Sequence, residues 1–211
     1  MAVTSACSIN FKPTPTPELP AVSITMPPEP SKLPALNTAT EPPAVTVPTA
    51  AAVPVCPKAA ASEPLFTFVL STEPFRLCFL YPADFTAKYS ENLNGYLFSG
   101  TPYGTGEKLA GSVSLGYQPA GGKTLEQYAA DTTAAQAPGL GLALIPLTLG
   151  ADVPAIRVDG IPGMVGTVTL FIVHNDTAFT LTFLPADTIP EAVADMLRLY
   201  ASLTASWVFT R

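Results

Sequence analysis

The sequence predicts an α+β fold in which a mainly antiparallel β-sheet is flanked by helices. Three observations predict it. Short apolar stretches recur from about residue 65 onward and are joined by short loops, which favours antiparallel strands. Two helical segments, one after Thr124 and one after Thr188, are far apart in the chain and can cover the apolar faces of a sheet. A long hairpin, Gly163–Pro185, has a pattern that specifies its own strand register.

The first 64 residues differ in composition from the rest of the chain. They hold 14 of the 24 prolines and none of the 14 glycines. Proline fixes φ and disfavours a helix in the residue before it, and such a segment cannot bury enough apolar surface to offset its ordering entropy. Residues 8–64 are therefore expected to form a disordered, extended linker. The alternative is a proline-rich ligand for a partner domain.

Residues 1–7, MAVTSAC, resemble the end of a bacterial lipoprotein signal, in which small residues precede a lipidated cysteine. They are interpreted as the remnant of such a signal, with lipid attached at Cys7. Two features depart from the pattern: Thr4 stands where leucine is usual, and the apolar segment needed for export is missing. The alternative is a stray cysteine near a disordered terminus. With lipid at Cys7, the protein would be anchored to a membrane by the lipid alone. The linker would then hold an extracytoplasmic domain away from that membrane.

The other two cysteines, Cys56 and Cys78, lie at the end of the linker and in an apolar strand. In an oxidising compartment they could form a disulfide that pins the linker to the edge of the domain. The alternative is that Cys78 is a small buried hydrophobic residue. Three cysteines and a single histidine exclude a multi-ligand zinc site, and we expect no metal and no other cofactor.

The charge of the chain restricts its partners. Ten basic and 16 acidic residues give a net charge of −6. This argues against nucleic acid or an anionic membrane surface as the main partner, because both require clustered Lys and Arg. No apolar run approaches the roughly 18 residues of a membrane span.

The globular domain is expected to cover residues 65–211, with seven or eight strands. Pro82 ends the second strand, and a glycine-rich loop separates the third from the fourth. Before the hairpin, strands are predicted at Leu65–Leu70, Phe75–Tyr81, Asn94–Ser99, Leu109–Tyr117, Leu142–Leu149 and Ala155–Val158.

Both helices are predicted from capping boxes. Thr124 and Gln127 begin the first, which should end near Gln136. Thr188 and Glu191 begin the second, which should run to about Thr204, with Asp195 and Arg198 able to pair at i, i+3. The apolar stripe of the second helix comprises Ile189, Val193, Met196, Leu197, Tyr200 and Leu203. This helix is expected to cover the apolar side of the hairpin, and a short extended segment, Ser206–Phe209, should close the core.

In the hairpin, Asn175 and Asp176 are taken as a two-residue loop, since both residue types tolerate left-handed backbone angles. One face of the ribbon is then wholly apolar and the other is mixed. The expected pairs are Ile172 with Phe179, Leu170 with Leu181, Val168 with Phe183, Phe171 with Thr180, and Thr169 with Thr182.

Several of these features resemble PsbP-like domains, named after an extrinsic subunit of photosystem II. They are the strand ending in Leu80-Tyr81-Pro82, the strand entry Val153-Pro154-Ala155, the mid-chain helix, the long hairpin and the terminal Ser206-Trp207-Val208-Phe209. The resemblance covers about residues 65–209 and implies a central antiparallel sheet sandwiched between helices. The family includes photosystem subunits, transport cofactors and bacterial lipoproteins, and is mainly a scaffold for binding and assembly. No functional residue of the family can be matched to a position in this chain.

Candidate catalytic chemistry is restricted to His174, the single histidine, which lies beside Asp176 at the hairpin turn. A serine hydrolase would have to use this histidine, whereas a histidine beside a turn more often bonds local backbone groups. Aspartates in loops and at strand ends could supply a calcium site, although they lack consecutive ligand spacing: Asp84, Asp152, Asp159, Asp176 and Asp187.

The function favoured by the sequence is a non-enzymatic, membrane-tethered extracytoplasmic lipoprotein that binds or helps to assemble a protein partner at the membrane surface. The alternatives are an extracytoplasmic hydrolase that uses His174 and a carrier for a small ligand.

Overall fold

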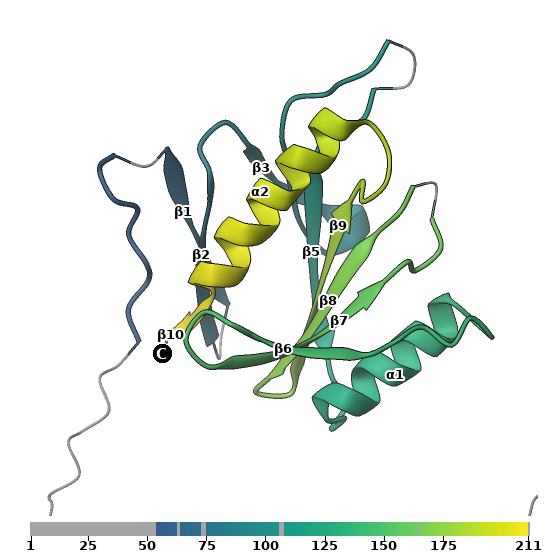
Figure 1. The fold of residues 1–211 in the computed structure, drawn as a ribbon. Coiled ribbons are helices and arrows are strands. Elements are labelled where there is room, and N and C mark those ends of the chain that lie inside the picture. Colours follow the sequence, from purple (N-terminus) through teal and green to yellow (C-terminus); the bar gives the residue numbers. More distant parts are fainter. Residues whose placement is uncertain (1–53, 63, 73–74, 106–107, 164, 211) are drawn as a thin grey trace, which may run out of the picture. The chain divides into compact units, whose positions relative to one another are not determined.

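The computed structural model describes residues 54–62, 64–72, 75–105, 108–163 and 165–210. In these segments the chain forms ten strands in two antiparallel sheets, with two α-helices and one short 3-10 helix (Figure 1). The predicted α+β class with a dominant antiparallel sheet is confirmed. Cys7, with its predicted lipidation, and residues 8–53 of the predicted linker lie outside the described residues.

The smaller sheet has three strands in the order β1-β2-β10. It joins the first two strands of the domain to the last one, so both ends of the domain lie in one sheet. The strands are β1 (Leu65–Thr72), β2 (Phe75–Pro82) and β10 (Val208–Thr210).

The larger sheet has seven strands in the order β3-β4-β5-β9-β8-β7-β6, and every neighbouring pair is antiparallel. The hairpin strands β8 and β9 therefore lie at the middle of the sheet. The strands are β3 (Thr86–Ser90), β4 (Gly95–Ser99), β5 (Ser112–Pro119), β6 (Ile145–Leu149), β7 (Val153–Asp159), β8 (Val168–His174) and β9 (Thr177–Leu184), and the 3-10 helix η1 (Glu91–Leu93) precedes β4.

The predicted hairpin register is confirmed. Ile172 faces Phe179, and the register continues in steps of one residue to Val168 opposite Phe183. Asn175 and Asp176 have φ angles of 47° and 57°, as a two-residue turn between twisted strands requires. A slip of one residue would move the apolar side chains to the other face, and this excludes the neighbouring registers.

The first helix, α1 (Leu125–Gln136), begins as predicted. The Thr124 side chain accepts a hydrogen bond from the Gln127 backbone N–H, and the Gln127 side chain accepts one from the Thr124 N–H. Buried Tyr128 and Ala129 pack with Ile156 and Phe171, so α1 covers the mixed face of the hairpin and the adjoining β7.

The second helix, α2 (Pro190–Ser206), begins later than predicted. The capping box at Thr188 is wrong: the N-cap is Ile189, which makes no side-chain cap hydrogen bond, and the Thr188 hydroxyl is buried without a partner among the described groups. Pro190 takes the first helical position instead, where its missing N–H costs nothing. The fixed φ of proline thus sets the start in place of the threonine side chain.

The apolar stripe of α2 is also partly wrong. Ile189 precedes the helix, and Leu197 is 55% exposed. The buried line is Ala192, Met196, Leu199 and Leu203, because α2 packs against β2 as well as against β5 and β9 of the larger sheet. In Figure 1, α2 crosses in front of these strands.

Two strand predictions need correction. The described residues form ten strands rather than seven or eight, because the extended terminal segment is a strand, β10, and because β3 was missed: its residues are exposed or half-buried and show no apolar alternation. β7 begins at Val153, two residues before the predicted start at Ala155, so Pro154 lies inside the strand. It is tolerated because β7 pairs with β8 only from Ile156 onward, so the missing N–H interrupts no bonding to β8.

The main core lies on the apolar side of the hairpin, between the larger sheet, α2 and the smaller sheet. The expectation that α2 covers this side of the hairpin is confirmed. Among the largest fully buried side chains are Trp207, Phe79, Phe98, Phe179, Phe183 and Leu170.

Candidate functional site

His174 and Asp176 contact different neighbours. The His174 ring stacks on Phe209 of β10, with ring centroids 3.9 Å apart, and its Nε2 lies 3.1 Å from the Asn175 side-chain nitrogen. Asp176 instead accepts a hydrogen bond of 2.7 Å from the Gly122 N–H, which holds the loop before α1. Burial against Phe209 lowers the pKa of His174, which favours the neutral ring. Both side chains therefore contact structural neighbours.

Cys56 and Cys78 are joined as a disulfide, with Cα atoms 5.6 Å apart. Cys78 lies in the middle strand of the smaller sheet and is fully buried. The bond holds the segment that precedes the domain against the outer side of β2.

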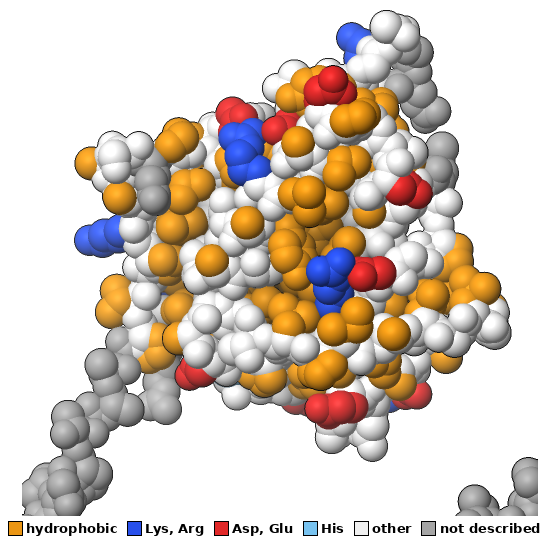
Figure 2. All heavy atoms as spheres, viewed as in Figure 1, with side chains coloured by type: hydrophobic (Ala, Val, Ile, Leu, Met, Phe, Trp, Pro, Cys, Tyr) orange, Lys and Arg blue, Asp and Glu red, His pale blue; other side chains and the backbone are white. Residues whose placement is uncertain are grey.

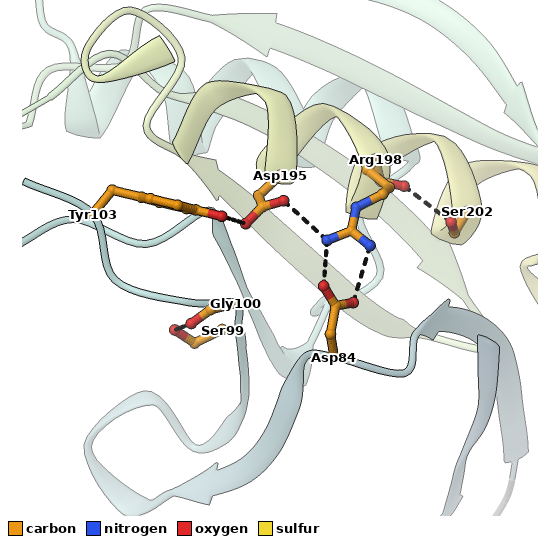
Figure 3. Close-up of polar contacts among 7 residues, drawn as sticks. All are labelled: Asp84, Ser99, Gly100, Tyr103, Asp195, Arg198 and Ser202. Atoms are coloured by element: carbon orange, nitrogen blue, oxygen red, sulfur yellow. Dashed lines mark hydrogen bonds and ion pairs between the residues drawn. The ribbon is translucent and has the colours of Figure 1, made fainter. Parts of the chain in front are cut away.

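A polar cluster links three separate segments (Figure 3). Arg198 of α2 donates two hydrogen bonds, of 3.0 and 2.6 Å, to Asp84 in the β2–β3 turn. It donates a third, of 2.9 Å, to Asp195, which confirms the predicted i, i+3 pair. Tyr103, in the glycine-rich loop, donates to the other oxygen of Asp195 at 3.0 Å. The cluster thus fastens a turn and a loop to the helix.

One guanidinium, that of Arg198, is shared between two carboxylates, Asp84 and Asp195, in this cluster. The hydrogen bond from Arg198 lowers the pKa of Asp84, and the same contact raises the pKa of the guanidinium. The hydrogen bond to Asp195 raises the pKa of the Tyr103 phenol. These shifts keep the carboxylate, guanidinium and phenol in their ordinary ionisation states at neutral pH, so the arrangement holds its segments together and presents no reactive base.

The lowered pKa of Asp84 predicts a pH dependence of stability. The Asp84 carboxylate contributes to the free energy of unfolding above the pKa of about 4 that the carboxyl has in the unfolded chain. This contribution is lost as the pH falls through the lower pKa of Asp84 in the folded protein. Asp84→Asn should lower the free energy of unfolding at pH 7 by less than about 1 kcal/mol, because the Asp84 side chain is 55% exposed. Near pH 2 the variant and the wild type should be equally stable.

Urea unfolding at pH 7, 4 and 2 measures this difference. In an Arg198→Gln background, the effect of Asp84→Asn should disappear at every pH. An effect of Asp84→Asn on stability that persists in the Arg198→Gln background would contradict Arg198 as the cause of the lowered pKa of Asp84.

The surface beside α2 carries exposed apolar side chains. Leu197 and Tyr200 are one helical turn apart, and the Arg157 guanidinium of β7 lies 5.7 Å from the centre of the Tyr200 ring. Ile145 of β6 is the register partner of Arg157 and is 43% exposed, and half-buried Leu147 follows on the same face. These five residues are called the α2 face. Figure 2 shows hydrophobic side chains gathered over α2 and beside it.

The positive charge of the α2 face is neutralised within the protein. Arg157 Nε donates a hydrogen bond of 2.7 Å to Asp159, and this contact raises the pKa of the guanidinium. An exposed apolar surface that includes a paired cation and a tyrosine is typical of protein–protein contacts.

The aspartates considered for calcium are dispersed. Asp84 bonds Arg198, Asp159 bonds Arg157, Asp176 bonds Gly122, and Asp187 accepts from the Gly166 N–H. Across the described part of the chain, no three His, Cys, Asp or Glu side chains group as a metal site would require. Within the same residues, neither helix has the length and hydrophobicity needed to cross a membrane.

No protein family model matches this chain, and no curated protein matches it either.

Sequence reasoning missed most of the α2 face. Leu197 and Tyr200 belong to the apolar stripe predicted for the second helix, whose periodicity gives no sign that Leu197 is exposed. Met196 and Leu197 are adjacent in the sequence, so a stripe that contains both is too wide to be buried along a single contact of the helix. This width was the one sign in the sequence that a residue of the stripe would be exposed. Asp84 and Tyr103 gave no such signal, since they meet Arg198 and Asp195 across 114 and 92 residues of sequence.

Proposed function

We propose that this protein is a non-enzymatic binding or assembly module, and that its α2 face docks a protein partner at a membrane surface. The observation that carries the proposal is the exposure of Leu197 of α2 and of Ile145, the strand partner of Arg157, whose guanidinium lies over the half-buried Tyr200 ring. Tyrosine and arginine are enriched among the few residues that supply most of the binding energy at protein interfaces, and the α2 face holds one of each, Tyr200 and Arg157.

Charge favours a protein partner over a lipid surface. The one cation of the α2 face, Arg157, is paired with Asp159, and the whole chain has a net charge of −6. Anionic lipid requires several unpaired cations near the surface. A protein partner with an apolar patch can bind the α2 face without unpaired cations.

Hydrolysis by His174 receives less support. The imidazole lies flat on Phe209, and Asp176 is directed to the Gly122 N–H. A general base must be aligned by an acidic partner and must reach a nucleophile. The contacts of His174 supply neither.

The proposal includes the tether. Lipid at Cys7 and the predicted linker of residues 8–64, whose last part is tied to the domain by the Cys56–Cys78 disulfide, would keep a PsbP-like domain close to the membrane but free to reach a partner. The short motifs around Tyr81, Pro154 and Trp207 support the PsbP-like likeness. Attachment to the same membrane as the partner raises the effective concentration, so a modest interface would suffice.

A site-specific photo-crosslinker at position 197 tests the proposal in cells that make the full chain with its native upstream sequence. We expect one discrete adduct in the membrane fraction, because the partner should cover Leu197. Ile145→Asp in the same protein should reduce the adduct at least about tenfold, since a buried unpaired charge costs several kcal/mol.

The matched control places the crosslinker at Leu93, a leucine of η1 that is 44% exposed and lies outside the α2 face. Equal adducts at the two positions, or none at 197, would contradict docking at this face. Cys7→Ser should release both protein and adduct from the membrane fraction, and retention there would contradict the lipid anchor.

A further inference from the structure

We propose that a pocket beside the Cys56–Cys78 disulfide binds a small organic carboxylate with a short aliphatic chain. The pocket has a volume of about 450 Å³, within the range of roughly 300–1,000 Å³ typical of ligand sites. It lies away from α2, so this proposal does not depend on the protein-docking function. Its lining includes Val55, Pro57, Lys58, Thr67, Arg76 and Thr210.

The walls come from two parts of the chain that the disulfide holds together. Residues 54–58 form one wall, and the outer face of the smaller sheet forms the other. Successive residues of a strand alternate between faces, so Arg76 shares the face of Cys78, two positions away. Thr210 is the register partner of Arg76 and faces the same way.

Two cations meet in this pocket. Lys58 is two residues after Cys56, and Arg76 is two residues before Cys78, so the disulfide brings both basic side chains to one site. Within the described residues, neither takes part in an ion pair, whereas Lys123, Arg157 and Arg198 do. A pocket with two such cations, in a chain of net charge −6, is complementary to an anion.

The threonine hydroxyls hold the walls and are not free to donate to a ligand. Thr67 donates a hydrogen bond of 3.0 Å to the Pro57 carbonyl, which ties β1 to the opposite wall. Thr210 donates to the Arg76 carbonyl at 3.4 Å. The donors left for an anion are therefore the ammonium of Lys58 and the guanidinium of Arg76.

The shape of the ligand follows from the remaining lining. A guanidinium presents paired N–H groups that match the two oxygens of a carboxylate. Val55, Pro54 and Pro57 add apolar surface on the wall that carries Lys58. A carboxylate at the two cations with a short aliphatic chain along these residues uses both parts of the pocket.

Titration of the oxidised protein with hexanoate, followed by amide NMR, tests the proposal. We expect saturable shifts at Val55, Arg76 and Thr210, and none with hexanol, which has the same chain without the charge. Arg76→Gln should weaken hexanoate binding at least about tenfold, because it removes charge-assisted hydrogen bonds. Lys58→Gln should weaken it less, because a lysine contributes a point charge.

Lys88→Gln, which removes an exposed lysine of β3, is the matched control and should leave binding unchanged. Leu197→Asp should also leave it unchanged, which separates this site from the α2 face. Unchanged affinity in Arg76→Gln, equal binding of hexanol, or absence of hexanoate binding would overturn the proposal. Inorganic phosphate serves as a second probe, and phosphate binding tighter than hexanoate binding would overturn the carboxylate assignment.

The pocket should also depend on the disulfide. Cys56→Ser with Cys78→Ser releases the wall formed by residues 54–58 and should weaken hexanoate binding at least about tenfold. Circular dichroism checks that the sheets persist in this double variant. If the sheets are lost in the double variant, the effect of Arg76→Gln on hexanoate binding alone decides whether the proposal holds.

Discussion

Replacement of Trp207 by alanine is expected to lower the free energy of unfolding by about 3–5 kcal/mol. Trp207 is fully buried between α2 and β10, and its indole stacks on Phe79 with ring centroids 5.3 Å apart. It also makes edge contacts with Phe179 and Phe209. The cavity would therefore open where both sheets meet the helix, and neighbouring rings held in strands cannot collapse into it.

Urea unfolding followed by far-ultraviolet circular dichroism measures this loss, because Trp207 is the only tryptophan and fluorescence disappears with it. The melting temperature should fall on the order of 10 °C. Trp207→Phe is the control: it keeps a ring and removes an indole N–H that has no partner among the described groups, so it should cost clearly less. Equal losses in the two variants would contradict the cavity explanation.

Gly111→Ala is expected to destabilise the domain by about 1–3 kcal/mol through overpacking. A Cβ at this position would lie 2.5 Å from the Met196 backbone nitrogen and 2.6 Å from the Ala192 carbonyl oxygen. Both atoms belong to α2, whose backbone cannot shift without moving the core. The Gly111 carbonyl also accepts a hydrogen bond from the Gly100 N–H, so displacement would strain the loop that carries Tyr103.

The control is Gly116→Ala in β5. There the nearest heavy atom to an added Cβ is the Leu93 carbonyl oxygen at 3.4 Å, an ordinary contact. This variant should remain within about 0.5 kcal/mol of the wild type in the same urea experiment. Similar losses in the two alanine variants would indicate a general effect of glycine substitution rather than close packing against α2.

Elements with strong local patterns were predictable. The hairpin register followed from alternating apolar residues around Asn175 and Asp176, because any slip would exchange the two faces. The start of α1 followed from Thr124 and Gln127, whose side chains bond backbone groups only three residues away. In these elements the decisive contacts are local, so the sequence displays them directly.

Elements decided by packing were not predictable to the same degree. β3 has no buried side chain and is a strand only because β4 supplies its backbone hydrogen bonds. In α2, contact with β2 as well as the larger sheet selects Leu199 for burial and leaves Leu197 exposed. Helical periodicity cannot distinguish these two residues, because the choice depends on where the neighbouring sheet lies.

The sequence by itself determined the antiparallel α+β class, the central hairpin and the composition boundary near residue 65. It did so because strand alternation, turn chemistry and proline content act over a few residues. Only the tertiary structure brought Arg198 to Asp84, Arg157 to Tyr200 on the α2 face, and Lys58 to Arg76 beside the disulfide. Each of these contacts joins distant segments, and their proximity depends on how the two sheets and α2 pack around one core.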